Sequence, residues 1–222
     1  MGTLATLIVI GLMITTPRFV WGGEGSGVRP LTPAGDSQWQ SHLPADTHLL
    51  IESSAIEQFL DALDSMPPDW AAIYGRGHHE PGLDDRLFSL NRDRDAKREG
   101  KPALEWRITF LWSGELSDYN TKIGGFHVAV GPKFTSTRWG VVRFKPDDLP
   151  SNLTAIPSRS YRKALQRTLE RGQTIEVEVV LTGKLIPMEA LVYDFSHDEE
   201  GRGVIIPVVR IEQVDFILPS EK

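Results

Sequence analysis

The spacing of apolar residues changes near residue 105, and this change constrains the fold more than any other feature of the sequence. Before it, apolar residues recur every three or four positions, as on one face of a helix. After it, they alternate with polar residues, as in strands that bury one face. We therefore expect an α+β protein, with a small helical N-terminal region over residues 42–104 and a β-rich domain over residues 105–222.

Three segments of the N-terminal region carry helix signals. The first begins near Ser54, where Glu57 completes a capping box, and it ends before Pro67. One of its faces is expected to be buried, through Ile56, Phe59, Leu60 and Leu63. The other two predicted helices cover residues 69–74 and 84–99.

The C-terminal part predicts five strands and one helix. The strands are expected at residues 106–116, 126–130, 139–144, 175–181 and 204–216. Gly114 is expected to kink or bulge the first of them. The helix, at residues 160–171, lies between the third and fourth strands, and its predicted buried face consists of Tyr161, Ala164, Leu165, Thr168 and Leu169.

One stretch of this part resembles a known family. Leu165 and Leu169, then the run from Gly172 to Val179 and Gly183-Lys184-Leu185, resemble the "helix, Gly, then V-x-V-x-G" run of the tRNA_anti-like group of OB domains. The resemblance covers about residues 105–218 and implies a five-stranded OB-like Greek-key β-barrel with one helix between strands 3 and 4. A generic antiparallel β-sandwich with one inserted helix is the alternative.

The resemblance also implies a binding surface. In OB domains, ligands meet the face of strands two and three and the two loops beside it, which correspond here to residues 117–123 and 187–203. Interleaved cations and aromatic rings can stack on a ligand, which makes five residues candidates for ligand binding: Lys133, Phe134, Arg138, Trp139 and Arg143. In the alternative interpretation, Trp139 and Phe144 are core residues and the basic side chains solvate a strand edge.

The N-terminus points to export. Residues 3–16 are uncharged and mostly apolar, a run shorter than the ~20 residues that cross a bilayer. We expect residues 1–22 to be a signal peptide, followed by a flexible Gly- and Pro-rich leader over residues 23–41. The alternative is an uncleaved anchor over residues 3–21. Either reading places the rest of the chain outside the cytoplasm.

Charge and composition exclude several function classes. The 24 basic and 30 acidic residues leave a net charge of −6, so any positive surface has to be local. The chain has no Cys, which removes disulfides and thiolate chemistry. Neither His78-His79-Glu80 nor the acidic loop at residues 197–201 has metal-ligand spacing, so we expect no metal and no cofactor. The sequence contains no known hydrolase or nucleotide-binding motif.

These observations favour an exported, non-enzymatic binding module whose OB face takes a protein partner or a small polar ligand. One alternative is an extracytoplasmic enzyme that uses the acidic loop and two glutamates on one strand, Glu176 and Glu178. Another is single-strand nucleic-acid binding, against which export and negative charge both argue. Membrane contact is expected only through an uncleaved N-terminal segment.

Overall fold

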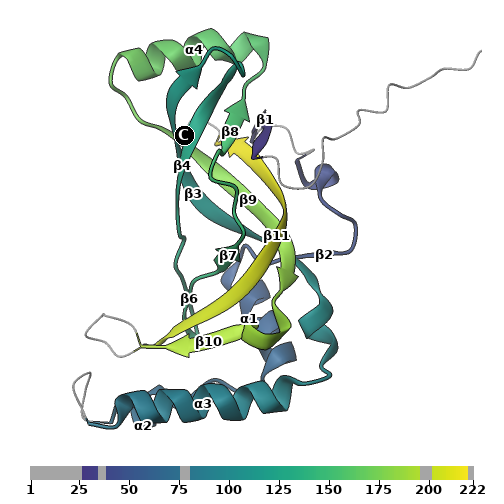
Figure 1. The fold of residues 1–222 in the computed structure, drawn as a ribbon, viewed down its shortest axis with the longest axis vertical. Coiled ribbons are helices and arrows are strands. Elements are labelled where there is room, and N and C mark those ends of the chain that lie inside the picture. Colours follow the sequence, from purple (N-terminus) through teal and green to yellow (C-terminus); the bar gives the residue numbers. More distant parts are fainter. Residues whose placement is uncertain (1–26, 35–38, 76–80, 196–201, 220–222) are drawn as a thin grey trace, which may run out of the picture.

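A closed barrel of six strands with helices at both ends forms the protein, so the mixed α+β class is confirmed (Figure 1). The computed structural model describes residues 27–34, 39–75, 81–195 and 202–219. The helices are α1 (Ser53–Leu63), α2 (Trp70–Tyr74), α3 (Leu83–Arg98) and α4 (Arg159–Glu170). The strands are β1 (Val28–Pro33), β2 (Thr47–Leu49), β3 (Arg107–Asn120), β4 (Gly125–Gly131), β5 (Thr135–Thr137), β6 (Gly140–Val142), β7 (Lys145–Asp147), β8 (Thr154–Ile156), β9 (Ile175–Leu185), β10 (Leu191–Asp194) and β11 (Val204–Leu218). Short 3-10 turns are η1 (Trp39–His42), η2 (Pro102–Glu105) and η3 (Pro187–Glu189).

The barrel runs in the order β1-β8-β4-β3-β9-β11, and β11 closes it by pairing with β1. The β8–β1 and β1–β11 pairs are parallel, whereas the others are antiparallel. Apolar side chains fill the interior, among them Phe110, Phe126, Val179 and Phe216, each at most 1% exposed. Gly114 lies among these side chains, where a Cβ would come within 2.8 Å of the Val179 side chain. The barrel is therefore a packed core and not a pore.

At one end of the barrel, β5, β6 and β10 extend the sheet along β11, and α1, α2 and α3 pack there (Figure 1). The four predicted apolar residues of α1 are all buried, which confirms the periodicity argument. Trp70 of α2 packs against Gly203, where a Cβ would lie 2.3 Å from its ring. The Trp70 indole also donates a 2.6 Å hydrogen bond to the Trp139 carbonyl, which fixes α2 to the turn before β6.

The segment before α1 covers the outer face of β3, β9 and β11. There Leu111, Val180 and Ile217 form a second small core beneath Trp39 and Leu43. The prediction of a flexible leader over residues 23–41 is therefore wrong for residues 28–33 and 39–41, which form β1 and most of η1. The strand β1 is ordered although glycines and prolines surround it. Its backbone pairs with β8 and β11, and Leu31 is buried.

Other local predictions need correction. The predicted third strand at residues 139–144 shrinks to β6, which lies outside the six-strand ring, and β8 takes the place before α4. The predicted loop at residues 187–203 contains η3 and β10. The register shift of β3 lies between Leu116 and Tyr119 rather than at Gly114.

The N-terminus of α1 and the buried face of α4 also differ from expectation. Glu52 is the N-cap of α1, and its side chain makes no capping hydrogen bond. Glu57, the predicted capping-box residue, accepts a 2.8 Å hydrogen bond from the Arg138 backbone N–H. On α4 only Leu165 of the predicted face is buried, whereas Tyr161 is 44% exposed.

Several predicted features lie outside the described residues: the signal segment at residues 1–22, His78-His79-Glu80 and the acidic loop at residues 197–201. Within the residues that are described, no helix has the length and apolar character that crossing a membrane requires.

Candidate functional site

The five residues predicted to bind a ligand do not share one surface. Trp139 is fully buried, and its indole donates a 3.2 Å hydrogen bond to Asp61 of α1. The Arg138 guanidinium forms ion pairs with Asp61 and Glu57. These two residues therefore hold the β5–β6 turn on α1. Burial of Trp139 and of Phe144, which is 5% exposed, is what the alternative interpretation expects.

The other three predicted residues lie apart from this contact. Phe134 is 56% exposed, and Arg143 is partly buried. The Arg143 Nε atom is buried without a hydrogen-bond partner among the residues described. Lys133 lines a surface hollow of about 320 Å³ together with Glu176 and Glu178, the pair of carboxylates singled out from the sequence.

This hollow, which we call the glutamate groove, lies on the outer face of β3 and β9. Glu115 stands directly opposite Glu176 in the strand register, and Ser113 stands opposite Glu178. Like charges in such a position repel each other. In the part of the chain that the structure describes, no group of His, Cys, Asp or Glu residues is arranged to hold a metal ion.

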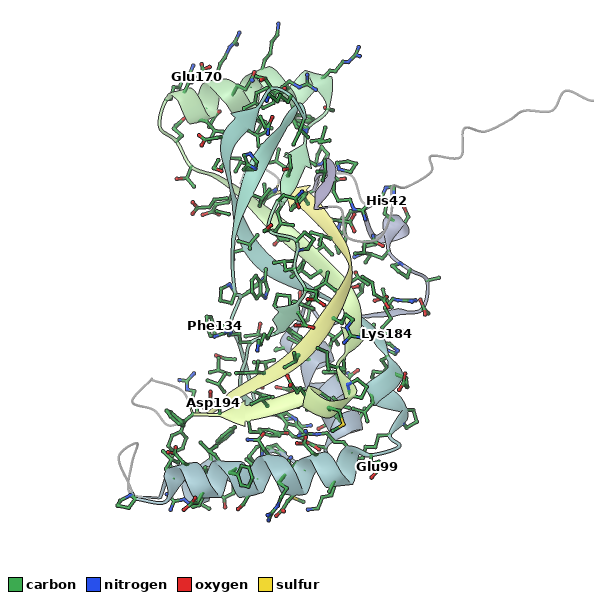
Figure 2. All side chains as sticks on the ribbon, in the orientation of Figure 1. His42, Glu99, Phe134, Glu170, Lys184 and Asp194 are labelled. Carbon is green, nitrogen blue, oxygen red and sulfur yellow. The ribbon has the colours of Figure 1, made fainter. Side chains whose placement is uncertain are left out.

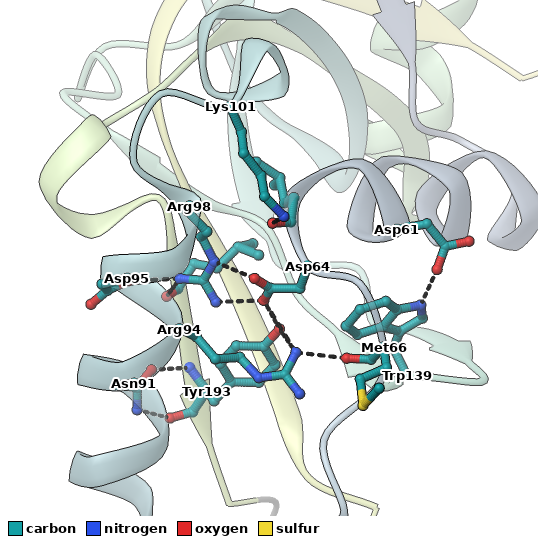
Figure 3. A network of polar contacts seen from close by, with 12 residues as sticks. Asp61, Asp64, Met66, Asn91, Arg94, Asp95, Arg98, Lys101, Trp139 and Tyr193 are labelled. Carbon is teal, nitrogen blue, oxygen red and sulfur yellow. Dashed lines mark hydrogen bonds and ion pairs between the residues drawn. The ribbon is translucent and has the colours of Figure 1, made fainter.

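Two buried charged side chains, Asp64 and Arg98, lie at the centre of the network in Figure 3, where α1, α3 and β10 meet. Arg98 is 2% exposed and donates to both oxygens of Asp64, at 3.0 and 2.7 Å. The Tyr193 hydroxyl donates a 2.5 Å bond to Asp64, and the Arg94 guanidinium lies 3.3 Å from the same carboxylate. Arg98 also reaches Asp95 at 2.7 Å. We call this set the Asp64 network.

Charge and burial compete inside the Asp64 network. Burial raises the pKa of Asp64, but the hydrogen bonds and positive charge of Arg98 outweigh it and hold that pKa below its usual value. Burial, followed by the negative charge of Asp64, raises the pKa of Tyr193 well above its usual value. Each charged group of the network has a partner within the protein, so the network joins α1, α3 and β10.

A different arrangement lies between η1, β1 and β11. Asp215, on the outer face of β11, lines a hollow of about 130 Å³. Other residues that line it include Pro30, Trp39 and Phe216. A second hollow, of about 300 Å³, is lined by Arg29, His42, Glu212 and Gln213, and His42 lines both. We call the pair the His42–Asp215 site.

Asp215 is only partly compensated for its burial. The Gln213 side-chain amide donates a 2.6 Å hydrogen bond to Asp215 and also donates to the His42 carbonyl at 3.3 Å. Burial raises the pKa of Asp215, and neither this bond nor the positive charges of Arg29 and His42 bring it back to its usual value. A carboxyl with a raised pKa in an apolar-walled hollow is a common property of functional sites.

The sequence reasoning missed this site, although one signal was present. Val179-Val180-Leu181 and Phe216-Ile217-Leu218 are continuous apolar runs, which indicate strands buried on both faces. A strand that is apolar on both faces needs a second layer on its outer face, and residues from 39–51 supply it. The placement of His42 and Asp215 at one hollow has no local signal in the sequence.

Comparison with known proteins identifies no relative: no family model, no curated protein and no solved structure matches the chain.

Proposed function

We propose that this protein is an extracytoplasmic, non-enzymatic binding module and that its ligand site is the His42–Asp215 site. One observation carries the proposal: two adjoining hollows share His42, one apolar around the Asp215 carboxyl and the other lined by Arg29, His42, Glu212 and Gln213. Placement outside the cytoplasm rests on the apolar run at residues 3–16.

The chemistry of the site favours a small ligand that carries both charges. Asp215 and the indole ring of Trp39 suit an ammonium group, since a carboxylate pairs with it and an aromatic face attracts it. Arg29 and His42 suit a carboxylate. An α-amino acid with an apolar side chain, or the end of a peptide, combines these features.

Three matched probes test this proposal by chemical-shift mapping on the full chain: L-leucine, 3-methylbutylamine and 4-methylpentanoate. We expect leucine to shift the amides of residues 29–32, 39–43 and 213–217 at lower concentration than either single-charge analogue. Asp215→Asn should weaken leucine binding about tenfold or more, whereas the exposed-site control Asp118→Asn should not. Absence of any shift at these amides with all three probes would reject the proposed ligand class.

We also propose that the barrel is an elaborated OB barrel. The five OB strands would be β3, β4, β8, β9 and β11, with α4 between the third and fourth. Two features support this: β3 pairs with both β4 and β9, and β1 bridges β8 and β11 in parallel. In this view β1 is an additional strand inserted where the third and fifth OB strands would meet. An experimentally determined structure in which β8 and β11 belong to different sheets would reject it.

A second candidate function is an extracytoplasmic enzyme with an acidic site. The observation that favours it is that Glu115, Glu176, Glu178 and Lys133 line one hollow. If it is correct, Glu176→Gln should abolish hydrolysis of a substrate found by screening saccharides, while Asp215→Asn should leave it intact. An unchanged rate in Glu176→Gln would exclude a catalytic role for this carboxylate.

A further inference from the structure

Helix α4 concentrates positive charge that the balance of the whole chain conceals. Residues 105–222 carry 15 basic and 16 acidic residues, so as a group they are almost neutral. Within α4, however, four residues are basic and only Glu170 is acidic. The basic residues of α4 and its surroundings are Arg159, Arg162, Lys163, Arg167, Arg171 and Lys122. We call these six residues the α4 cation patch.

Ion pairs within the described part of the chain do not neutralise the cation patch. Among the residues that the structure describes, no member of the patch forms an ion pair with a carboxylate, whereas Arg98, Arg107 and Arg138 all do. Arg162 lies over the Tyr119 ring at 6.0 Å instead. Figure 2 shows long, nitrogen-tipped side chains that project from α4 away from the barrel. This end of the molecule therefore presents positive charge to its surroundings.

Apolar side chains are exposed at the same end. Tyr161 of α4 is 44% exposed, and Ile123 in the β3–β4 turn is 43% exposed. The turn lies beside the helix, because a Cβ on Gly124 would be 3.8 Å from the Arg162 guanidinium. Cations mixed with exposed aliphatic and aromatic groups suit the boundary between lipid headgroups and acyl chains.

The chain also enters the barrel at this end. The Thr154 N–H donates to the Gly27 carbonyl at 2.8 Å, so the first described residue lies beside β8, the strand that leads into α4. Figure 1 shows β1 and β8 side by side below α4. The apolar run at residues 3–16 precedes Gly27 by ten intervening residues, which span at most about 35 Å.

From charge, exposed apolar groups and chain entry together, we propose that the α4 end of the barrel is a docking surface for a membrane that contains anionic phospholipid. The phosphate-bearing headgroups meet the cation patch, while Tyr161 and Ile123 reach into the interface. This contact is additional to the N-terminal segment, which was the only membrane contact expected from the sequence. A segment that tethers the chain within about 35 Å would hold the patch near the bilayer surface.

Lysine footprinting on the full chain separates this contact from insertion of the N-terminal run. The protein is mixed with vesicles of phosphatidylcholine alone or with 30% phosphatidylglycerol added, and the reaction of each Lys with an amine reagent is followed by mass spectrometry. We expect protection of Lys122 and Lys163 only with phosphatidylglycerol, and loss of this protection in 0.5 M salt. Lys97 on α3 should react equally in all samples.

Two triple variants complete the test. Arg159→Gln/Lys163→Gln/Arg167→Gln should lower the affinity for anionic vesicles about a hundredfold, with protection read at Lys122, because each basic residue near the surface contributes several-fold. Arg92→Gln/Lys97→Gln/Lys145→Gln removes the same charge elsewhere and should bind like the unaltered chain. Equal reactivity of Lys122 and Lys163 in both kinds of vesicle would overturn the proposal. Protection of these lysines by an oligonucleotide but not by vesicles would overturn it in favour of nucleic acid.

Discussion

Asp64 is buried and Asp215 is partly buried, and the protein compensates the charges of these two aspartates in opposite ways. Arg98 donates to both oxygens of Asp64 and lowers its pKa, whereas Asp215 keeps a raised pKa beside an apolar hollow. The first carboxylate is used to join α1, α3 and β10. The second is the group that we propose to bind a ligand. The structural carboxylate and the candidate binding group therefore differ in how far neighbouring positive charges compensate them.

The largest loss of stability is expected when Asp64 is removed. Asp64→Ala leaves Arg98 buried without its main partner, and we expect the free energy of unfolding to fall by about 3–5 kcal/mol in urea denaturation. Asp95→Asn, at the half-exposed edge of the network, should cost less than about 1 kcal/mol. Similar losses in both variants would show that burial of the pair is not what matters.

A smaller loss is expected at the edge of β10. The Asn91 side chain donates to the Tyr193 carbonyl at 2.8 Å and accepts from the Tyr193 N–H at 2.7 Å, as a neighbouring strand would. Asn91→Ala should cost about 1–3 kcal/mol, since both backbone groups lose their partner. Hydrogen exchange should accelerate at the Tyr193 amide. If that amide stays protected in the variant, the side chain does not cover the strand edge.

At Asp215 we expect a substitution to stabilise the protein instead of destabilising it. A raised folded-state pKa means that the folded protein holds the proton more tightly than the unfolded chain, so stability falls as the pH rises from about 3.9 through that pKa. Asp215→Asn removes this penalty and should stabilise the protein by about 1 kcal/mol at pH 7, with no gain at pH 3. Thermal unfolding at the two pH values measures this. Destabilisation at pH 7 would mean that the carboxylate is a structural partner.

The smallest effect concerns the outer barrel face that residues 39–51 leave uncovered. Glu115 and Glu176 oppose each other there, so Glu176→Lys should raise the free energy of unfolding by about 0.5 kcal/mol. Glu189→Lys, on the exposed turn η3, serves as the control for the change in net charge. An equal gain in the control would assign the effect to overall charge.

Local patterns predict the local parts of this fold. The apolar spacing of Ile56, Phe59, Leu60 and Leu63 identifies α1 and its buried face, and alternation identifies β3, β4 and β9. The strand β1 was not predicted, because its glycine- and proline-rich surroundings favour a coil. Pairing with β8 and β11 orders it.

Neither carboxylate could be assigned its role from sequence alone. Asp64 and Arg98 meet across 34 positions, and His42 and Asp215 line one hollow only because residues 39–51 lie on the outer face of the barrel. Trp139 looks like a stacking residue in the sequence, but the fold buries it against α1. Such contacts depend on tertiary packing, which residue periodicity does not encode.

The most direct test of the contrast is a carbon-detected NMR titration of the carboxyl groups of Asp64 and Asp215 in the same sample. We predict that Asp64 titrates below the ordinary value of about 3.9 and Asp215 above it. If the order is reversed, or if both groups titrate together, Asp215 is compensated as fully as Asp64 and the His42–Asp215 site loses its basis.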